Sequence, residues 1–292
     1  MQPTTPTSRL NNNGTCRTSR GALHFILPCM GEKTGKLWQM NYMRSLSLAV
    51  ATIFSTLSGL KADESIDNLI DLAKKGDLTA QITLGYRYSN GDGVLKDNVE
   101  SVKWYRLAAG QGLDLAQLMM AIAYHSGNGV QKNDVEAAKW CRLSADQGVS
   151  RAQLMLAKMC SKGAGVPKDD VEAAKWCRLA AEQGLDEAQW ILGNFYTSGR
   201  GVEEDASMAV KWYRLAAEQG FSKAQQDLGF RLAVGQGVPK HTIEAYKWLN
   251  LAASQGDELA EKARELVAKE MSPEQIAEAQ QLSKEWKPTV TK

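Results

Sequence analysis

One segment of 36 residues returns five times without insertion, and this repeat constrains the fold more than any other feature of the chain. Gly165, Trp176 and Gly184 mark the segment, and each has counterparts 36 residues earlier and later. The five copies run from Ala80 to Leu259. A fixed period of about 20–50 residues is typical of an array of similar units, each of which buries its apolar face against its neighbours.

Each copy contains two helical patterns that flank a glycine loop. In the fourth copy, Ala188, Leu192 and Tyr196 recur at a spacing of four residues, which places them on one face of a helix. The loop reads Gly-x-Gly-Val, and its glycines supply positions where a positive φ costs little. The residue after the Leu is small in every copy, so we expect a neighbouring helix backbone to pass close to it: Gly85, Ala121, Ala157, Gly193 and Gly229.

The second helix of each copy begins at a polar residue. Asp169 is followed three residues later by Glu172, which predicts a reciprocal capping box, and Asp97 and Asn133 begin the same pattern. The apolar stripe of this helix combines small alanines with the repeated Trp, which we interpret as a core residue and not as part of a ligand cage. The helix ends at Gln-Gly, where Gly184 suits the left-handed position after a helix.

The charge of the chain is unevenly distributed. Residues 1–62 contain seven Lys or Arg and one Glu, whereas the remainder contains 28 basic and 32 acidic residues. The repeat region is therefore mildly acidic and has no basic patch of the kind that a polyanion requires. We expect no binding to nucleic acid.

The N-terminal residues predict a targeting segment. Residues 1–42 are rich in Thr, Asn, Ser and Gly, as is typical of a disordered leader. From Met43, one Arg and a short apolar run lead to Ala62, which predicts a signal peptide over residues 43–62 with cleavage near Ala62. We expect translation to begin at Met43, and the mature chain to be periplasmic or secreted and without an integral membrane span. The alternative is that Met1 is the true start and that the segment is a signal anchor.

The repeated residues resemble a known family. The pattern Ala-x-x-x-Leu-Gly-x-x-Tyr, Gly-x-Gly-Val, Asp-x-x-x-Ala-x-x-Trp and Ala-Ala-x-Gln-Gly is similar to the Sel-one-like repeat, a relative of the tetratricopeptide repeat. The resemblance implies an all-α fold, an α-solenoid of antiparallel helix pairs that forms a tetratricopeptide-like superhelix with five 36-residue repeats. It also implies a role in protein–protein assembly, often in bacterial envelopes.

The two ends of the array are expected to be capped. Residues 63–79 match the second helix of a copy and predict an N-terminal capping helix. Residues 260–292 predict two C-terminal capping helices, the last of which starts at Ser272, Pro273 and Gln275. With five pairs over residues 80–259, we expect about 13 helices and no strands.

Few residues point to chemistry. His125 and His241 lie 116 positions apart, and no pair has the spacing of a metal site, so we expect no metal and no cofactor. Cys141 and Cys177 occupy the same position of neighbouring copies, too far apart for a disulfide, whereas Cys160 could reach either one. The sequence leaves the redox state of these three cysteines open.

Two functions remain. The favoured one is a non-catalytic protein–protein interaction scaffold of the bacterial cell envelope. The alternative is a cell-wall-active or penicillin-binding, β-lactamase-like repeat protein, because a cysteine-rich branch of the resembled family has been linked to penicillin binding. The residue set of β-lactamases argues against that alternative, since Ser-x-x-Lys occurs only at Ser58 to Lys61 and Ser-Asp-Asn does not occur.

Comparison of the five copies separates fixed positions from variable ones. The variable positions lie on a second face of the first helix, which by resemblance to tetratricopeptide arrays lines the concave surface. We expect an apolar strip there, flanked by basic residues, that binds a protein or peptide partner; the alternative is that part of it is buried between helices. We call this set the first-helix stripe: Tyr86, Leu118, Ile122, His125, Leu154, Lys158, Lys162, Trp190, Asn194 and Phe230.

Overall fold

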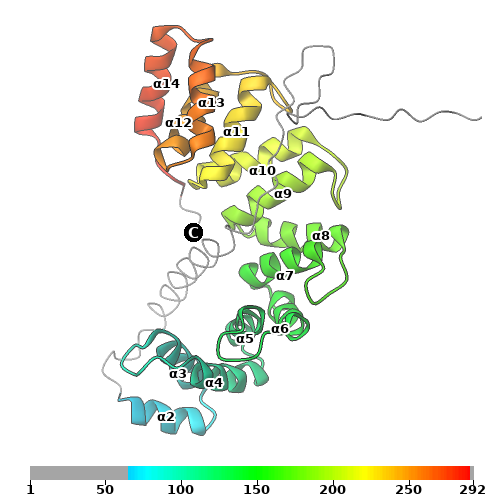
Figure 1. Cartoon of the computed structure of the whole chain (residues 1–292), viewed down its shortest axis with the longest axis vertical. Coiled ribbons are helices and arrows are strands. Elements are labelled where there is room, and N and C mark those ends of the chain that lie inside the picture. The colour runs from blue at the N-terminus through cyan, green and yellow to red at the C-terminus, as the bar shows by residue number, and fades with distance from the viewer. Residues whose placement is uncertain (1–64, 290–292) are drawn as a thin grey trace, which may run out of the picture. The chain divides into compact units, whose positions relative to one another are not determined.

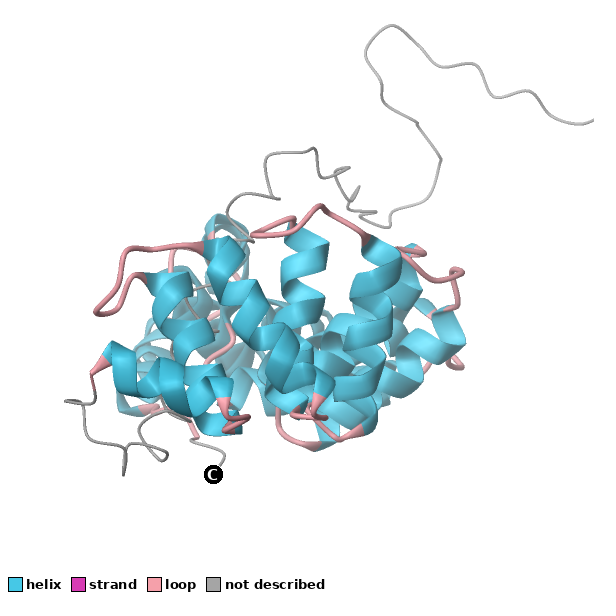
Figure 2. Ribbon diagram, turned by 90° about the horizontal axis from the view of Figure 1, so that it is seen from below, coloured by secondary structure: helices cyan, strands magenta, loops and turns pink. Residues whose placement is uncertain are grey.

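The computed structural model of the protein describes residues 65–289, which form 13 helices joined by short loops, with no strand among them (Figures 1 and 2). In chain order these are α2 (Ile66–Lys74), α3 (Leu78–Asn90), α4 (Asn98–Gly110), α5 (Asp114–Ser126), α6 (Asp134–Asp146), α7 (Ser150–Lys162), α8 (Asp170–Glu182), α9 (Asp186–Ser198), α10 (Ala206–Glu218), α11 (Ser222–Val234), α12 (Thr242–Ser254), α13 (Glu258–Ala268) and α14 (Pro273–Glu285). The predicted order of one N-terminal helix, five pairs and two C-terminal helices is confirmed.

The helices pack in chain order, as expected of a solenoid. Each first helix packs on the second helix of its own copy, for example α7 on α8, and each second helix packs on the first helix of the next copy, for example α8 on α9. In Figure 1 the pairs follow one another from α2 at the bottom to α14 at the top. In the middle of the array, the first helices α5 and α7 lie to the left of the second helices α6 and α8.

The N-terminal predictions lie outside the described residues. This holds for the leader over residues 1–42, for the signal peptide over residues 43–62 and for cleavage near Ala62. Within residues 65–289, every helix is too short or too polar to cross a membrane.

The second helices begin where the sequence predicts. Oδ1 of Asp169 accepts hydrogen bonds from the backbone N–H groups of Val171 and Glu172, each at 2.9 Å. Asp97 and Asn133 cap α4 and α6 in the same way. These caps satisfy backbone donors that have no partner inside the helix.

The reciprocal half of the predicted capping box is wrong for these helices. The Glu172 side chain instead accepts hydrogen bonds from Nη2 of Arg142, at 2.7 Å, and from Nε1 of Trp176, at 3.3 Å. Because Arg142 belongs to the preceding copy, the glutamate links two repeats instead of closing its own cap. Among the described helices, the complete box occurs in α14, between Ser272 and Gln275.

The glycine loop joins each copy to the one before it. Gly165 has a φ of +72°, and a Cβ atom placed there would overlap the backbone oxygen of Asp134, the first residue of α6. Gly93 occupies the same loop position in the first copy with a φ of +69°, yet a Cβ there would meet nothing within 4 Å. Glycine is therefore required twice over at Gly165, for its backbone conformation and for close approach.

The small residue of the first helix makes room for an aromatic ring, so the prediction that a backbone passes there is wrong. A Cβ atom on Gly193 would lie 2.6 Å from Cε1 of Tyr213, and Gly85 faces Tyr105 in the same way. In the copies that have Ala121 or Ala157, the residue at the Tyr position is Cys. The volume removed from one helix is thus returned by the other.

A ladder of glutamine side chains crosses the array, and the sequence gave no prediction of it. Nε2 of Gln183 donates to Oε1 of Gln153, at 2.8 Å, and to the carbonyl of Gly148, at 3.0 Å. Nε2 of the buried Gln153 donates in turn to the carbonyl of Ala145, at 3.3 Å. The same Gln–Gln bond recurs at 111–81, 147–117, 219–189 and 255–225. Because these buried amides find partners, the ladder fixes the distance between repeats.

Gln153→Met is expected to lower the free energy of unfolding by about 1–3 kcal/mol, because it leaves Gln183 and the carbonyl of Ala145 each without one partner. Urea denaturation measures the loss. Gln183→Ala should cost less when it is combined with Gln153→Met than when it is made alone, since both changes break the same bond. A loss below about 0.5 kcal/mol, the size of an ordinary surface change, would contradict this role.

The repeated Trp side chains lie in or against the core, as predicted, but unequally. Trp104 and Trp248 are buried, whereas Trp140, Trp176 and Trp212 are half-buried and pack against the core from outside. The additional cover over Trp248 comes from the last helix of the chain.

That last helix, α14, packs on α12. Its Ala279 and Ser283 are buried, and the ring of Trp286 meets Trp248 edge-on, with centroids 6.1 Å apart. After α14 the chain turns back to α10, where the backbone N–H of Thr289 donates to the carbonyl of Glu218 at 2.8 Å. The C-terminal cap is therefore fixed at both of its ends.

Candidate functional site

The described residues hold no group of three His, Cys, Asp or Glu side chains arranged to bind a metal ion. The three cysteines of the repeats are free and buried. Burial raises the pKa of Cys141 and of Cys177 to about 12, and the pKa of Cys160 to about 11. All three are protonated thiols at neutral pH, so none is an activated nucleophile. They fill space, as the pairing of Cys with Ala across the helices indicates.

The first-helix stripe is partly buried, as the alternative interpretation of the sequence allows. Leu118 is 1% exposed and Leu154 is 4% exposed, and both belong to one apolar cluster that extends from α5 to α9. Neither can contact a partner in this conformation. We call the remaining eight residues the open stripe; Lys162 is exposed and the others are half-buried: Tyr86, Ile122, His125, Lys158, Trp190, Asn194 and Phe230.

Trp190 of α9 is held against the next copy. Its Nε1 donates a hydrogen bond to Oδ2 of Asp227, on α11, at 2.7 Å. Its ring lies 5.7 Å from the ring of Phe221, and Nζ of Lys223 lies 5.0 Å from its centroid. The larger side chain at this position thus bridges two repeats and still leaves part of its surface open.

A polar cluster continues from Trp190 along α9. The hydroxyl of Tyr213 donates to Oδ1 of Asn194 at 2.7 Å, and Nη2 of Arg231 donates to Oγ1 of Thr197 at 2.8 Å. The guanidinium carbon of Arg231 lies 5.2 Å from the centroid of the Tyr213 ring. Arg231 is only 8% exposed, and its Nη1 is buried without a hydrogen-bond partner among the described residues. Helices α9, α10 and α11 therefore meet around a buried cation.

The charges in this cluster are shifted by burial. Burial raises the pKa of Asp227, although the hydrogen bond from Trp190 and the positive charge of Arg231 act in the opposite direction. Burial likewise raises the pKa of Tyr213. Folding therefore disfavours the charged form of the Asp227 carboxyl group.

Asp227→Asn is expected to change how stability depends on pH. A carboxyl group whose pKa is raised in the folded state destabilises the protein as pH rises from the ordinary Asp value, about 4, through the folded pKa. Asn keeps an oxygen that can accept the Trp190 bond but does not ionise. Urea denaturation at several pH values should show the variant gaining stability relative to the original chain as pH rises toward neutrality. An equal difference at every pH would contradict this assignment.

Lys158 connects two first helices in the middle of the stripe. Its Nζ lies 2.7 Å from Oε1 of Glu187, which joins α7 to α9. Lys162, one turn further along α7, is exposed. The basic flank predicted beside the stripe is thus an ion pair at Lys158 and an accessible lysine at Lys162.

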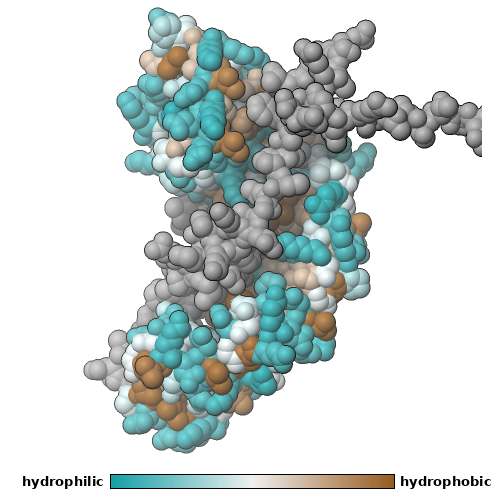
Figure 3. All heavy atoms as spheres, in the orientation of Figure 1, coloured by the Kyte–Doolittle hydropathy of each residue, from teal (hydrophilic) through white to brown (hydrophobic). Residues whose placement is uncertain are grey.

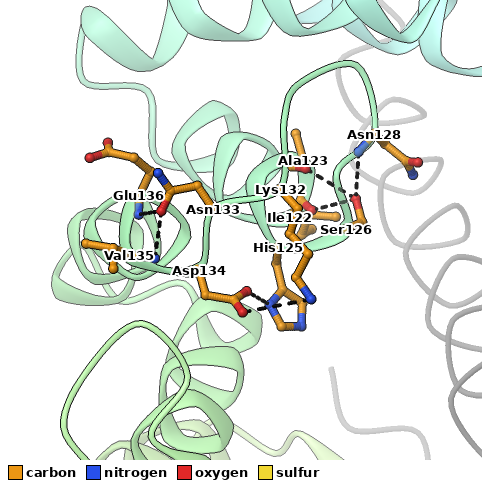
Figure 4. A network of polar contacts seen from close by, with 10 residues as sticks. All are labelled: Ile122, Ala123, His125, Ser126, Asn128, Lys132, Asn133, Asp134, Val135 and Glu136. Carbon is orange, nitrogen blue, oxygen red and sulfur yellow. Dashed lines mark hydrogen bonds and ion pairs between the residues drawn. The ribbon is translucent and has the colours of Figure 1, made fainter.

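His125 lies at the end of α5 and pairs with the start of α6 (Figure 4). Its Nδ1 lies 2.6 Å from Oδ1 of Asp134, and Nζ of Lys132 lies 3.9 Å from Oδ2 of the same carboxylate. The three residues enclose the glycine loop of the second copy. His125 therefore braces this loop, and part of its ring remains accessible.

The sequence interpretation missed Asp227, Arg231 and Thr197. A signal for Asp227 exists, because the other copies have Thr, Met, Met and Ile at this position and a carboxylate there needs a partner. The partner, Trp190, lies 37 positions earlier, one repeat plus one residue. A residue that departs from the repeat consensus in one copy is thus matched by a departure in the copy beside it.

The chain matches a known family model over most of the repeat region. The model described as the Sel1 repeat matches residues 78–113, 114–149, 150–185, 186–221 and 222–257. These boundaries lie two residues ahead of those read from the sequence and have the same period. A search of curated proteins found no match.

Two solved structures are similar to the chain. One is described as c5321, a protective antigen present in uropathogenic Escherichia coli strains displaying an SLR fold; it is 33% identical, with a TM-score of 0.69, and the match covers 75% of this chain and 48% of that one. The other is a Sel1 repeat protein from Oxalobacter formigenes, 32% identical with a TM-score of 0.64, and here the match covers 71% and 60%. The chain thus matches about half to three fifths of the length of these proteins. The family and both structures are those of repeat solenoids, not of enzymes.

Proposed function

Because the chain belongs to the Sel1 repeat family, whose members generally mediate protein–protein interaction, we propose that it is a non-catalytic interaction scaffold of the bacterial cell envelope. The partner is a protein or peptide that binds the open stripe on the concave, first-helix side. The observation that carries this proposal is that half-buried apolar side chains at Ile122, Trp190 and Phe230 alternate with polar groups along successive first helices.

The contacts around the open stripe support a surface that is rigid before it binds. The bond from Trp190 to Asp227 and the ion pair between Lys158 and Glu187 each join one first helix to the next. A surface whose side chains are already fixed loses less conformational entropy when a partner binds. Partly exposed aromatic side chains on such a surface are typical of residues that dominate binding energy.

The location in the envelope rests on the N-terminal sequence. Residues 43–62 have the order of a signal peptide, with one basic residue, an apolar run and a small residue near the expected cleavage site. Export would place the repeats in the periplasm or outside the cell, among envelope proteins. N-terminal sequencing of the exported chain tests this part: a first residue near Asp63 supports it, and a first residue at Met1 refutes it.

Trp190→Ala is expected to weaken partner binding at least tenfold, because truncation of a central Trp commonly costs about 2 kcal/mol or more. The loss of the Asp227 bond also perturbs the fold locally, so Trp190→Phe is the matched variant: it keeps an aromatic ring beside Phe221 and removes only the Nε1 donor. Titration calorimetry measures both affinities. If Trp190→Ala binds the partner as well as the original chain does, the open stripe is not the binding surface.

Site-specific photo-crosslinking identifies the partner and tests the surface together. A photoreactive residue at Ile122 or Phe230 should crosslink one envelope protein, whereas the same residue at the exposed loop position Glu203 should not. Crosslinking of equal yield and identity at all three positions would refute the proposed surface. Covalent labelling of the purified chain by a fluorescent penicillin would refute the non-catalytic function.

A further inference from the structure

The second helices carry a repeated row of exposed apolar residues that the proposed function does not use. Near the start of these helices lie Val99, Val135 and Val171, and near their ends lie Leu107, Leu143, Leu179 and Leu215. All seven side chains are between 44% and 54% exposed. They occupy the same two positions of consecutive copies, eight residues apart, and an exposed Lys lies midway between them in each helix. We call this surface the outer row.

The outer row lies on the side of the array opposite the first helices. In Figure 1 the second helices α6 and α8 form the right-hand edge, and Figure 3 shows hydrophobic residues among hydrophilic ones along that edge. Single exposed apolar residues are common on soluble proteins and carry no meaning by themselves. A row that repeats in four consecutive copies is a continuous surface and indicates a contact.

The fifth copy shows what such a surface binds. Its outer-row residues are Ile243, Lys247 and Leu251, and there Ile243 and Lys247 are half-buried while Leu251 is 9% exposed. The difference between this copy and the others is α14, which packs on α12. Leu251 belongs to the same apolar cluster as Ala279 of α14.

The contact between α12 and α14 has a defined chemistry. Ile276, Ala279, Ser283 and Trp286 share one face of α14, at a spacing of three, four and three residues, and all are buried or half-buried. Oγ of Ser283 donates to the carbonyl of Lys247, at 3.4 Å, through its small side chain. Small residues in the centre of the stripe allow close approach, and larger apolar ones at its ends anchor it.

We propose that the outer row of α4, α6, α8 and α10 binds an amphipathic helix of another protein, in the way that α12 binds α14. The stripe of that helix holds small residues at its centre and apolar or aromatic residues at its ends. The argument is one of continuity, because the occupied surface on α12 and the open surface on the preceding second helices are the same positions of one repeat. The partner on this side differs from the one at the open stripe, so the array holds two proteins at once on opposite sides.

A labelled peptide of residues 272–289, which carries the α14 stripe, is the probe. Added to the full chain, whose own α14 covers α12, it should bind saturably in a fluorescence anisotropy titration. The double variant Leu143→Lys and Leu179→Lys should lower the affinity at least tenfold. Leu95→Lys is the matched control, since Leu95 is 90% exposed, apolar and outside the row, and it should leave the affinity unchanged.

The alternative outcomes separate clearly. A peptide with Ala279→Glu should not bind, because the charge falls in the centre of the stripe. Circular dichroism should show the double variant fully folded, since Leu and Lys have similar helix propensities and the changed positions are exposed; Leu143→Lys alone provides a milder variant with a smaller loss. Absence of saturable binding to the original chain would overturn the proposal. Equal affinity for the double variant would do so as well, because the peptide would then be exchanging with α14 on α12.

Discussion

Trp248→Ala is expected to lower the free energy of unfolding by about 3–5 kcal/mol, the range for truncation of a fully buried aromatic side chain. Trp248 is 2% exposed, its Nε1 donates to Oε1 of Glu244 at 3.2 Å, and the rings of Trp248 and Trp286 meet at the base of α14. Truncation opens a cavity where α12 meets the C-terminal cap. Hydrogen exchange followed along the chain measures the effect copy by copy.

Trp176→Ala is the matched control, because it removes the same residue from the same repeat position in a copy where the ring is only half-buried. Its cost should be clearly smaller, and the exchange it accelerates should centre on α8. In a solenoid each copy contacts only its neighbours, so local changes stay local. Equal losses for the two variants, or exchange accelerated equally over all repeats, would contradict this picture of the array.

Gly165→Ala is expected to cost about 2–5 kcal/mol. A left-handed conformation costs a non-glycine residue about 1–2 kcal/mol, and forcing an added atom into a filled space costs about 1–3 kcal/mol more. The added methyl group would collide with the backbone oxygen of Asp134, which belongs to a helix of the preceding copy and cannot rotate away. Urea denaturation and exchange over α6 measure the effect.

Gly93→Ala isolates the second contribution. Gly93 has nearly the same φ and the same place in its loop, but nothing lies near its added methyl group. It should cost only the conformational part, about 1–2 kcal/mol. If both variants cost the same, then the glycine loop does not hold the copies together, and the helix faces and the glutamine ladder alone set their spacing.

The architecture could be predicted from the sequence because the repeat presents each constraint five times. The period fixes the unit, the Asp and Asn caps fix where α4, α6 and α8 begin, and the terminal half-repeats fix the caps. What is specific to one pair of copies could not be predicted so well. The small residue at Gly193 correctly indicated a close approach, but a single helix pattern cannot say whether a backbone or the ring of Tyr213 fills the space.

The candidate site shows the same limit more strongly. The periodicity placed Leu118, Leu154 and Trp190 on one helix face, but whether a face is open depends on how far each helix is rotated against the next. In the structure that rotation buries both leucines and leaves Trp190 half-open, bonded to Asp227. The glutamine ladder was equally hidden, since a pair of amides 30 positions apart becomes visible only when neighbouring copies are placed side by side.

Hydrogen exchange of the whole chain, free and in complex with the partner captured through Ile122 or Phe230, tests the central claim most directly. The predicted result is slower exchange in the first helices that carry the open stripe, α5, α7, α9 and α11, with exchange in α4, α6 and α8 unchanged. Slowed exchange confined to the second helices, with the first helices unaffected, would contradict the claim that this protein binds its partner on the first-helix side of the array.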